Sequence, residues 1–161
     1  MTTTIHLLIG SNMGDRKAYL AQAALQIGQK IGQITEKSRL YETQAWGITE
    51  QPDFMNQALA VETTLSPQAV LTKISDIETE MGRVRTEKWT ERTIDIDILL
   101  FADIIVDTPD LQIPHPRLPE RNFALVPLME IAGEVEHPIL KATIEDIYFE
   151  STDKLDVFEV E

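Results

Sequence analysis

The sequence contains no cysteine among its 161 residues. This absence excludes disulfide bonds, thiolate zinc sites and a cysteine nucleophile, and it favours the cytoplasm as the compartment. The chain also lacks any apolar run near the roughly 20 residues that a membrane-spanning helix needs. Its first residues carry no basic segment ahead of an apolar stretch, as a secretory signal would. We therefore expect a cytoplasmic protein with no membrane partner.

Positive charge is scarce. The 14 Lys and Arg residues stand against 27 Asp and Glu residues, which gives a net charge of −13. Such a surface repels nucleic acid, so we expect no nucleic-acid partner, and no feature indicates an obligate protein partner. The sequence also has no G-x-x-x-x-G-K-[ST] phosphate loop and no G-x-G-x-x-G dinucleotide motif. A phosphate-binding enzyme built on this chain must therefore hold its nucleotide through metal ions and arginines.

Apolar residues recur with the periods of strands and helices over the first 101 residues. Strands are expected at 4–10, 34–43, 54–64 and 93–101. Helices are expected from a cap at Asn12 or Asp15 to Gly32, and from Ser66 to Gly82. Each helix has one apolar stripe, so both should cover the same face of one antiparallel sheet. This order predicts a ferredoxin-like α+β sandwich with a βαββαβ core, within a single domain spanning 1–161.

The remaining third of the chain is less regular and forms C-terminal additions to this core. Residues 104–106 are expected to continue the last strand as a hairpin arm, and a short helix over 123–132 should break near Pro127. From Glu145 to Glu161, seven acidic residues and one lysine give a net charge of −6. We expect a solvated, partly structured tail whose apolar residues pack back on the body: Ile147, Phe149, Leu155 and Phe158.

Two carboxylates stand two positions apart in the expected strand 93–101. Asp95 and Asp97 share one face of that strand, about 6.6 Å apart, while the flanking isoleucines face the core. At about 6 Å, two unit charges repel by roughly 2.8 kcal/mol at an effective dielectric near 20. A hard dication such as Mg²⁺ offsets this repulsion and commonly completes its shell with water and substrate phosphates. The alternative is an ordinary surface strand whose polar residues face water.

Arginines gather around this acidic pair. Five of the seven in the chain lie between residues 83 and 121: Arg83, Arg85, Arg92, Arg117 and Arg121. Guanidinium groups match phosphate geometry, so carboxylate-bound dications with arginines around them indicate a polyphosphate site. Surface salt bridges with Glu87, Glu91 and Glu120 are the alternative. His115, between two prolines, either donates to a phosphate or stabilises a rigid turn.

A flat organic substrate could also be held. Aromatic residues occur in loops or at element ends, and Asn56 can both donate and accept hydrogen bonds to the edge of a heterocycle. The aromatic candidates are Trp46, Phe54, Trp89 and Phe123. Any one of them is more often a core residue.

Six motifs in order connect these residues to a known family: IGSNMGD, YETQAWG, QPDFMNQA, IETEMGRVR, RTIDIDILLF and IPHPRLPERNFALVPL. Over nearly its whole length the chain resembles the 6-hydroxymethyl-7,8-dihydropterin pyrophosphokinase family. The resemblance implies the fold predicted above. It also implies transfer of the β,γ-diphosphate of ATP to the hydroxymethyl group of the pterin, with release of AMP, in folate biosynthesis.

The resemblance further implies site residues, position by position. Asp95 and Asp97 would hold two Mg²⁺ ions on the triphosphate. The catalytic set would be Asp95, Asp97, Arg83, Arg85 and Arg92, with Arg83 and Arg85 on a mobile loop. ATP would contact Glu78, Arg83, Arg85, Arg92, Ile98, His115 and Arg121. The pterin would stack between Phe54 and Phe123, within a pocket formed by Gly10, Thr43, Ala45, Phe54, Asn56, Trp89 and Phe123.

The chain departs from the family pattern in one loop and two pocket positions. Thr90-Glu91 replaces the usual Gly or Ala followed by Pro, and only three residues separate Arg85 from Trp89. Gln44 stands where proline is common, and Phe54 where tyrosine is frequent. Two other functions remain open at this point: a nucleotide or metabolite sensor without catalysis, and a metal-dependent phosphoesterase that hydrolyses ATP without a pterin.

Overall fold

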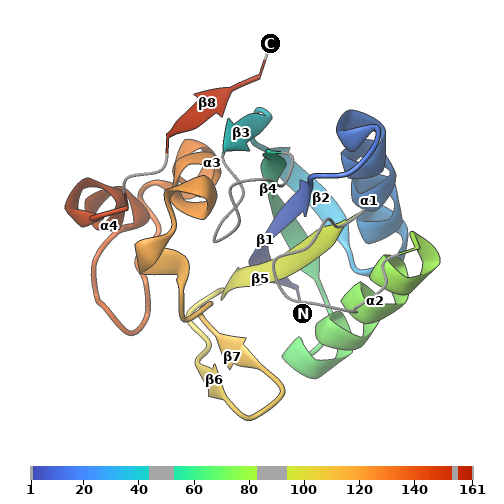
Figure 1. The fold of residues 1–161 in the computed structure, drawn as a ribbon. Coiled ribbons are helices and arrows are strands. Elements are labelled where there is room, and N and C mark those ends of the chain that lie inside the picture. The colour runs from blue at the N-terminus through green and yellow to red at the C-terminus, as the bar shows by residue number, and fades with distance from the viewer. Residues whose placement is uncertain (1, 44–52, 83–93, 154–155, 161) are drawn as a thin grey trace.

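A computed structural model describes residues 2–43, 53–82, 94–153 and 156–160 (Figure 1). Its main sheet is antiparallel, with the strand order β5-β1-β4-β3-β8, and β2 also pairs with β4. The strands of this sheet are β1 (Thr3–Ser11), β2 (Gln33–Lys37), β3 (Tyr41–Thr43), β4 (Phe54–Thr63), β5 (Asp95–Phe101) and β8 (Val157–Glu159). The helices are α1 (Arg16–Lys30), α2 (Pro67–Glu80), α3 (Asn122–Ala132) and α4 (Ile144–Glu150). The βαββαβ order and the ferredoxin-like α+β fold are confirmed.

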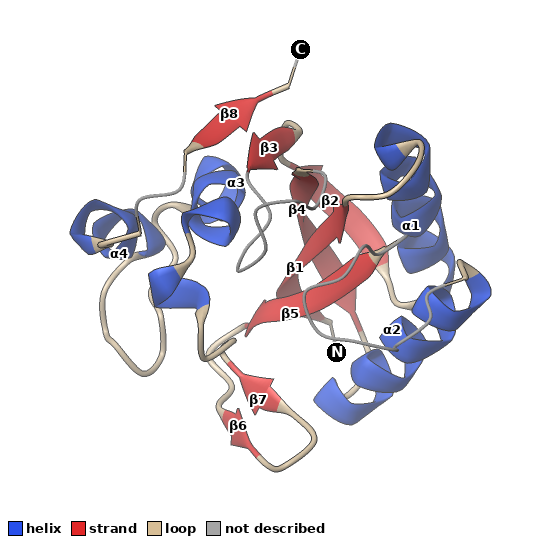
Figure 2. Ribbon diagram, in the orientation of Figure 1, coloured by secondary structure: helices blue, strands red, loops and turns tan. Residues whose placement is uncertain are grey.

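The two expected helices begin at their capping residues. Asp15, rather than Asn12, caps α1 by accepting a hydrogen bond from the Ala18 amide. Ser66 caps α2 by accepting from the Ala69 amide, and Pro67 occupies the first helical position. As expected, α1 and α2 cover the same face of the sheet, on the right in Figure 2.

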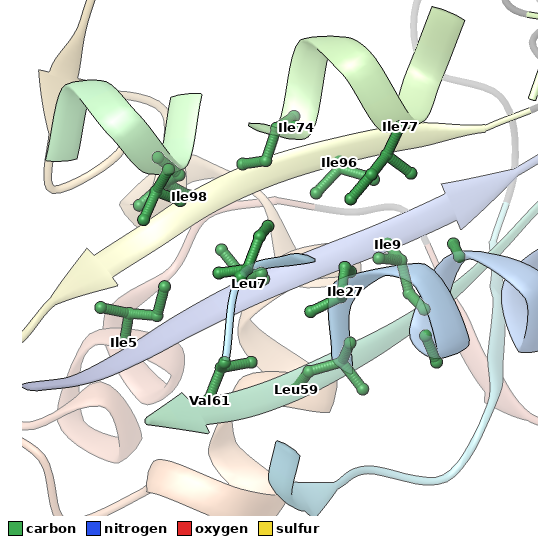
Figure 3. Close-up of a cluster of buried hydrophobic side chains, with 14 of the residues drawn as sticks. Ile5, Leu7, Ile9, Ile27, Leu59, Val61, Ile74, Ile77, Ile96 and Ile98 are labelled. Carbon is green, nitrogen blue, oxygen red and sulfur yellow. The ribbon is translucent and has the colours of Figure 1, made fainter. Parts of the chain in front are cut away.

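This face of the sheet is packed with aliphatic side chains. Alternate residues of each strand point toward the helices, such as Ile5, Leu7 and Ile9 of β1. They meet the apolar stripes of α1 and α2, for example Ile27 and Ile77, which have no exposed surface (Figure 3). Burial of these side chains removes hydrocarbon from water and contributes most of the stability of this layer.

The opposite face is covered by α3, and α4 packs against α3, so the sheet lies between helices on both faces (Figure 1). A second apolar cluster fills part of this interface, with Leu8 and Leu99 from the sheet packed against Leu125 and Leu128 of α3. The helix α3 runs through Pro127 without a break, so the expected interruption there is wrong. Pro127 lacks only the amide that would bond the Phe123 carbonyl, and burial of the helix outweighs that loss.

The expected strand 34–43 is divided into β2 and β3. Both halves pair with β4, but Ser38 interrupts the ladder between them. The Ser38 amide donates to the Ala58 carbonyl, and the Ser38 hydroxyl accepts from the Ala58 amide. A side chain thus replaces one backbone partner and bends the strand.

The hairpin arm expected at 104–106 is also corrected. Val106 begins β6 (Val106–Asp107), which pairs with β7 (Gln112–Ile113) in a separate two-stranded sheet instead of extending β5. Ala102 in the preceding turn adopts a positive φ of 50°, so the chain reverses before a longer ladder can form.

The acidic tail is more regular than expected. Its β8 strand pairs with β3 and extends the main sheet (Figure 1). Ile147 is buried as predicted, whereas Phe149 and Phe158 are 71% and 63% exposed, contrary to expectation. Phe149 lies on the face of α4 opposite the buried Ile144 and Ile147, as the helical period requires. Leu155 lies outside the described residues.

Among the helices that the structure describes, none is long and apolar enough to cross a membrane.

Candidate active site

A row of residues crosses four strands on the face covered by α3. Asn56 of β4 lies opposite both Tyr41 of β3 and Gly10 of β1. Gly10 in turn lies opposite Asp95 of β5. Directly opposed residues point to the same face, and neighbouring strands lie about 4.8 Å apart, so Asn56 and Asp95 stand roughly 10 Å apart across Gly10. The register therefore joins the predicted pterin residues to the predicted metal residues.

Gly10 has no side chain in the middle of this row, and the Asn56 side chain lies against it. A Cβ atom at this position would overlap the Asn56 side-chain oxygen Oδ1. Asn56 is only 4% exposed, and its amide occupies the space that any side chain at position 10 would need. Gly10 is therefore required for the position of the Asn56 amide group, as well as for backbone access to this face.

Phe54 and Thr43 lie opposite one another at the end of the β3–β4 ladder and share the face of Asn56. The buried Thr43 hydroxyl donates to the Asp156 carbonyl at 2.8 Å, which fixes its rotamer. Phe123, in the first turn of α3, is partly buried against the apolar cluster of the same face. The structure thus brings Gly10, Thr43, Phe54, Asn56 and Phe123 to one side of the sheet.

Asp95 and Asp97 lie half-buried on this same face of β5, while Ile96 and Ile98 between and after them enter the aliphatic core (Figure 3). This alternation is the one predicted from the sequence. Both carboxylates interact electrostatically with the Arg121 guanidinium, and Asp95 also interacts with His115. Two acids and two nitrogen donors therefore converge where β5 faces the start of α3.

His115 is held at the outer edge of β5. Its amide donates to the Leu99 carbonyl at 3.0 Å, and its Nδ1 accepts from the Arg117 amide at 3.2 Å. Burial, together with the positive charge of Arg121, lowers the pKa of His115 to about 4, against the opposing effect of Asp95. At neutral pH the ring is therefore uncharged and carries its proton on Nε2, as a hydrogen-bond donor.

Arg121 is the cation of this cluster. Burial lowers its pKa, and the carboxylate of Asp97 acts in the opposite direction. Its guanidinium carbon lies 5.4 Å from the centre of the Phe123 ring, within range of a cation–π contact. Among the described residues, its buried Nε finds no hydrogen-bond partner. The free Nε–H donor of Arg121 can bind an anion. The two neighbouring carboxylates would repel a bare anion, so the site suits an anion that binds together with metal cations.

A pocket of about 270 Å³ opens at the outer edge of β5. Its walls combine aliphatic side chains of α2 and β5 with polar residues, and both Asp97 and His115 belong to the lining. The lining residues include Leu71, Ile74, Ile98, Leu111, Gln112 and His115. Ile98 and His115 were predicted as nucleotide contacts from the family resemblance. Leu111 and Gln112 were missed, because nothing in the local sequence of this turn distinguishes it from an ordinary surface loop.

Glu78, also assigned to the nucleotide site by resemblance, lies on α2 and is 2% exposed. Its Oε2 accepts a hydrogen bond of 2.9 Å from the Ile96 amide. The contact places a buried carboxylate directly behind the segment that carries Asp95 and Asp97. The other predicted residues, Ala45, Arg83, Arg85, Trp89 and Arg92, lie outside the described residues.

The acidic pair has the donor chemistry expected for magnesium. Both side chains offer carboxylate oxygens on one face of β5, and oxygen is the ligand that Mg²⁺ prefers. Within the described ranges, no group of three or more His, Cys, Asp or Glu side chains gathers to form a complete metal cage. The pair thus fits ions that take their remaining ligands from phosphate and water.

Comparison with known proteins shows which family the chain resembles. The family model described as 7,8-dihydro-6-hydroxymethylpterin-pyrophosphokinase (HPPK) matches residues 6–133. A 2-amino-4-hydroxy-6-hydroxymethyldihydropteridine pyrophosphokinase from Aquifex aeolicus (strain VF5) is 41% identical over 149 residues, which is 92% of each chain. The enzyme of the same name from Bacillus subtilis (strain 168) is 42% identical over 137 residues, 84% of this chain and 82% of the relative.

Solved structures support the fold. An HPPK-DHPS from Plasmodium falciparum, crystallised with pteroate, superposes with a TM-score of 0.76 at 20% identity. The match covers 93% of this chain and 42% of that longer one, so this chain spans less than half the length of its structural neighbour. At this identity the likeness shows the fold alone.

Proposed function

Because this chain belongs to the 7,8-dihydro-6-hydroxymethylpterin-pyrophosphokinase (HPPK) family, we propose that it transfers the β,γ-diphosphate of ATP to the hydroxymethyl group of 6-hydroxymethyl-7,8-dihydropterin. The products are AMP and the pterin diphosphate. This is the pyrophosphokinase step of folate biosynthesis. In this proposal, residues 1–161 act as one catalytic domain, and the cytoplasmic location remains a prediction.

The observation that carries the proposal is the single row of residues across the sheet. Asn56, suited to reading a heterocycle, and Asp95, suited to binding magnesium, share one face about 10 Å apart, with Gly10 between them. A pterin on one side of Gly10 could direct its hydroxymethyl group toward phosphates on the other side. This spacing favours an enzyme that transfers a group between two bound substrates. It is less suited to a protein that binds only one of them.

ATP is assigned to the β5 edge. The aliphatic part of the pocket, at Ile74, Ile98 and Leu111, suits an adenine ring, which gains from contact with apolar side chains. Asp97 and His115, which also line the pocket, would then meet the phosphate chain. The neutral His115 ring donates from Nε2, and Arg121 offers its unsatisfied Nε–H. Both residues would therefore act as hydrogen-bond donors that orient the phosphates.

The pterin is assigned to the other end of the row. The Phe123 ring would offer one stacking surface, and Phe54, on the same side of the sheet, would offer a second. Asn56 would pair with the donor and acceptor edge of the heterocycle, where a buried amide rejects rings that lack matching groups.

Asp95 and Asp97 would hold two Mg²⁺ ions, which supply charge neutralisation for the triphosphate. The reaction forms a bond between the hydroxymethyl oxygen and the β-phosphorus, and it breaks the bond from that phosphorus to the oxygen retained by AMP. Such a transfer depends mainly on alignment and charge stabilisation. Arg121 and His115 would hold the phosphates in line. No general base is assigned.

One assay tests this function. The chain is incubated with ATP, Mg²⁺ and the reduced hydroxymethylpterin, and AMP is measured with and without the pterin. Pterin-dependent AMP formation is expected. ATP binding without AMP would instead support a sensor, and ATP hydrolysis in the absence of the pterin would support a phosphoesterase.

A further inference from the structure

The N-terminus of α3 is capped in an unusual way. Arg121 occupies the N-cap position, with φ −128° and ψ 96°, and its side chain makes no capping hydrogen bond. Arginine is not among the residues favoured at this position, because its side chain offers no acceptor oxygen for the exposed amides. The helix that carries Phe123 therefore lacks a cap of its own.

A residue from the acidic tail supplies the missing acceptor. The Asp153 carboxylate accepts a hydrogen bond of 2.8 Å from the Asn122 amide, the first amide of α3. The Asn122 side-chain amide donates back to the Asp153 carbonyl at 3.3 Å. Asn122 lies between Arg121 and Phe123 in the chain, so this two-point contact holds the backbone on which both depend.

The tail also holds the opposite wall of the candidate pterin pocket. Its strand β8 pairs with β3, and the Asp156 carbonyl accepts from the Thr43 hydroxyl at 2.8 Å. Glu159 pairs with Arg39 at 2.8 Å, and the Val160 amide donates to the Leu40 carbonyl at 2.8 Å. Residues of the acidic tail thus contact both the end of β3 and the start of α3, and Figure 2 shows β8 beside β3.

We propose that Asp153 is a positioning residue for substrate binding: it caps α3 in place of Arg121 and so holds Arg121 and Phe123 in their binding orientations. This inference rests on the proposed function. A serine or aspartate at position 121 would satisfy the helix but would place no cation beside Asp95 and Asp97. The chain separates the two tasks, with Arg121 serving the phosphates and Asp153, 32 positions later in the sequence, serving the helix.

Three variants of the full chain test the proposal. Asp153→Ala removes the acceptor, and Asp153→Asn keeps an acceptor oxygen without the charge. Asp156→Ala is the matched control, because it removes a nearby tail carboxylate while the backbone carbonyl that binds Thr43 stays. The KM for the pterin, the KM for ATP and kcat are measured for each. Amide exchange at Asn122 is followed in the ligand-free protein.

Asp153→Ala is expected to raise the KM for the pterin about tenfold and to speed exchange of the Asn122 amide at least about tenfold, since the capping acceptor is lost. Asp153→Asn should stay within about threefold of the parent in both, and Asp156→Ala should match the parent. If Asp153→Ala does not fold, Asp153→Glu replaces it, because the longer side chain moves the carboxylate by one methylene. Relative to Asp153→Asn, this variant should have a higher KM for the pterin and faster exchange of the Asn122 amide.

Two results would overturn the proposal. One is a pterin KM for Asp153→Ala equal to that of the parent, whatever its melting temperature. The other is a loss in Asp153→Asn as large as that in Asp153→Ala, because charge rather than capping would then matter. Failure of the proposed function looks different, since the parent chain itself would form no AMP with the pterin.

Discussion

The two faces of the main sheet perform different tasks with the same strands. The face under α1 and α2 is aliphatic, and the residues that β1 and β5 contribute to it include Ile5, Leu7, Ile9, Ile96 and Ile98. The face under α3 alternates with it and carries Gly10, Asp95 and Asp97 in the same two strands. The first face is therefore built for packing, whereas the second combines an apolar cluster, which includes Leu8 and Leu99, with the groups of the candidate site.

This difference shows how one small sheet supports both a core and a candidate site. Side chains alternate along a strand, so each strand can bury hydrocarbon on one face while it presents polar groups on the other. The aliphatic face and the apolar cluster of the α3 face stabilise the strands, and the α3 face can then keep two repelling carboxylates and the partly buried Arg121. The comparison predicts that substitutions on one face change stability and that substitutions at the site change activity.

The largest expected effect is on the polar face. Asp97→Asn should lower pterin-dependent AMP formation by about three orders of magnitude or more, because a metal ligand and its charge are lost together. The melting temperature should stay near that of the parent, since one of two repelling carboxylates is removed. Activity within about tenfold of the parent would contradict the assignment of the acidic pair.

A substitution on the aliphatic face should have the opposite signature. Ile27→Ala leaves a cavity in the layer between α1 and the sheet and should lower the free energy of unfolding by about 3–4 kcal/mol. Urea unfolding measures the change. Leu25→Ala on the same helix is the control, since Leu25 is 62% exposed and should cost less than about 1 kcal/mol. Equal losses in the two variants would contradict the described orientation of α1.

The pH dependence of stability tests a buried polar group on the α3 face, away from the site. Burial lowers the pKa of His6 to about 4, and within the described part of the chain its Nδ1 has no hydrogen-bond partner. Between about pH 7 and pH 5 the unfolded chain binds a proton at this residue and the folded chain does not, so stability falls as the pH falls. The loss from His6 should be about 2 kcal/mol over this range.

His6→Leu isolates this contribution. The variant should lose less stability than the parent between about pH 7 and pH 5 in urea unfolding, because no proton is bound at position 6 in either state. An unchanged pH slope would show that His6 has the same pKa in the folded and unfolded chain.

The smallest effect separates the two substrates. Phe123→Ala should weaken pterin binding about tenfold, which corresponds to about 1.4 kcal/mol, and should leave ATP affinity within about twofold. Calorimetric titration with each ligand measures this. Phe149→Ala is the control, because Phe149 is 71% exposed on α4. Equal losses for both ligands would indicate that Phe123 supports the fold rather than the pterin.

Local features of the fold could be predicted from neighbouring residues. The caps at Asp15 and Ser66 and the apolar periods placed α1 and α2, and the alternation around Asp95 and Asp97 placed both carboxylates on one face. The division of the strand at Ser38 could not be predicted, because it depends on a hydrogen bond to Ala58, 20 positions away. The site residues came mainly from family resemblance, and their roles remain predictions.

The sequence by itself determined the order of the elements over the first 101 residues, the spacing of the acidic pair and the clustering of arginines, because these depend on residues close together in the chain. Only the tertiary structure decided that Asn56, Gly10 and Asp95 form one row, since register is set by the packing of whole strands. It also decided that the tail extends the sheet as β8 and that Asp153 caps α3. Such contacts between distant segments become favourable only once the core has brought those segments together, so no local pattern records them.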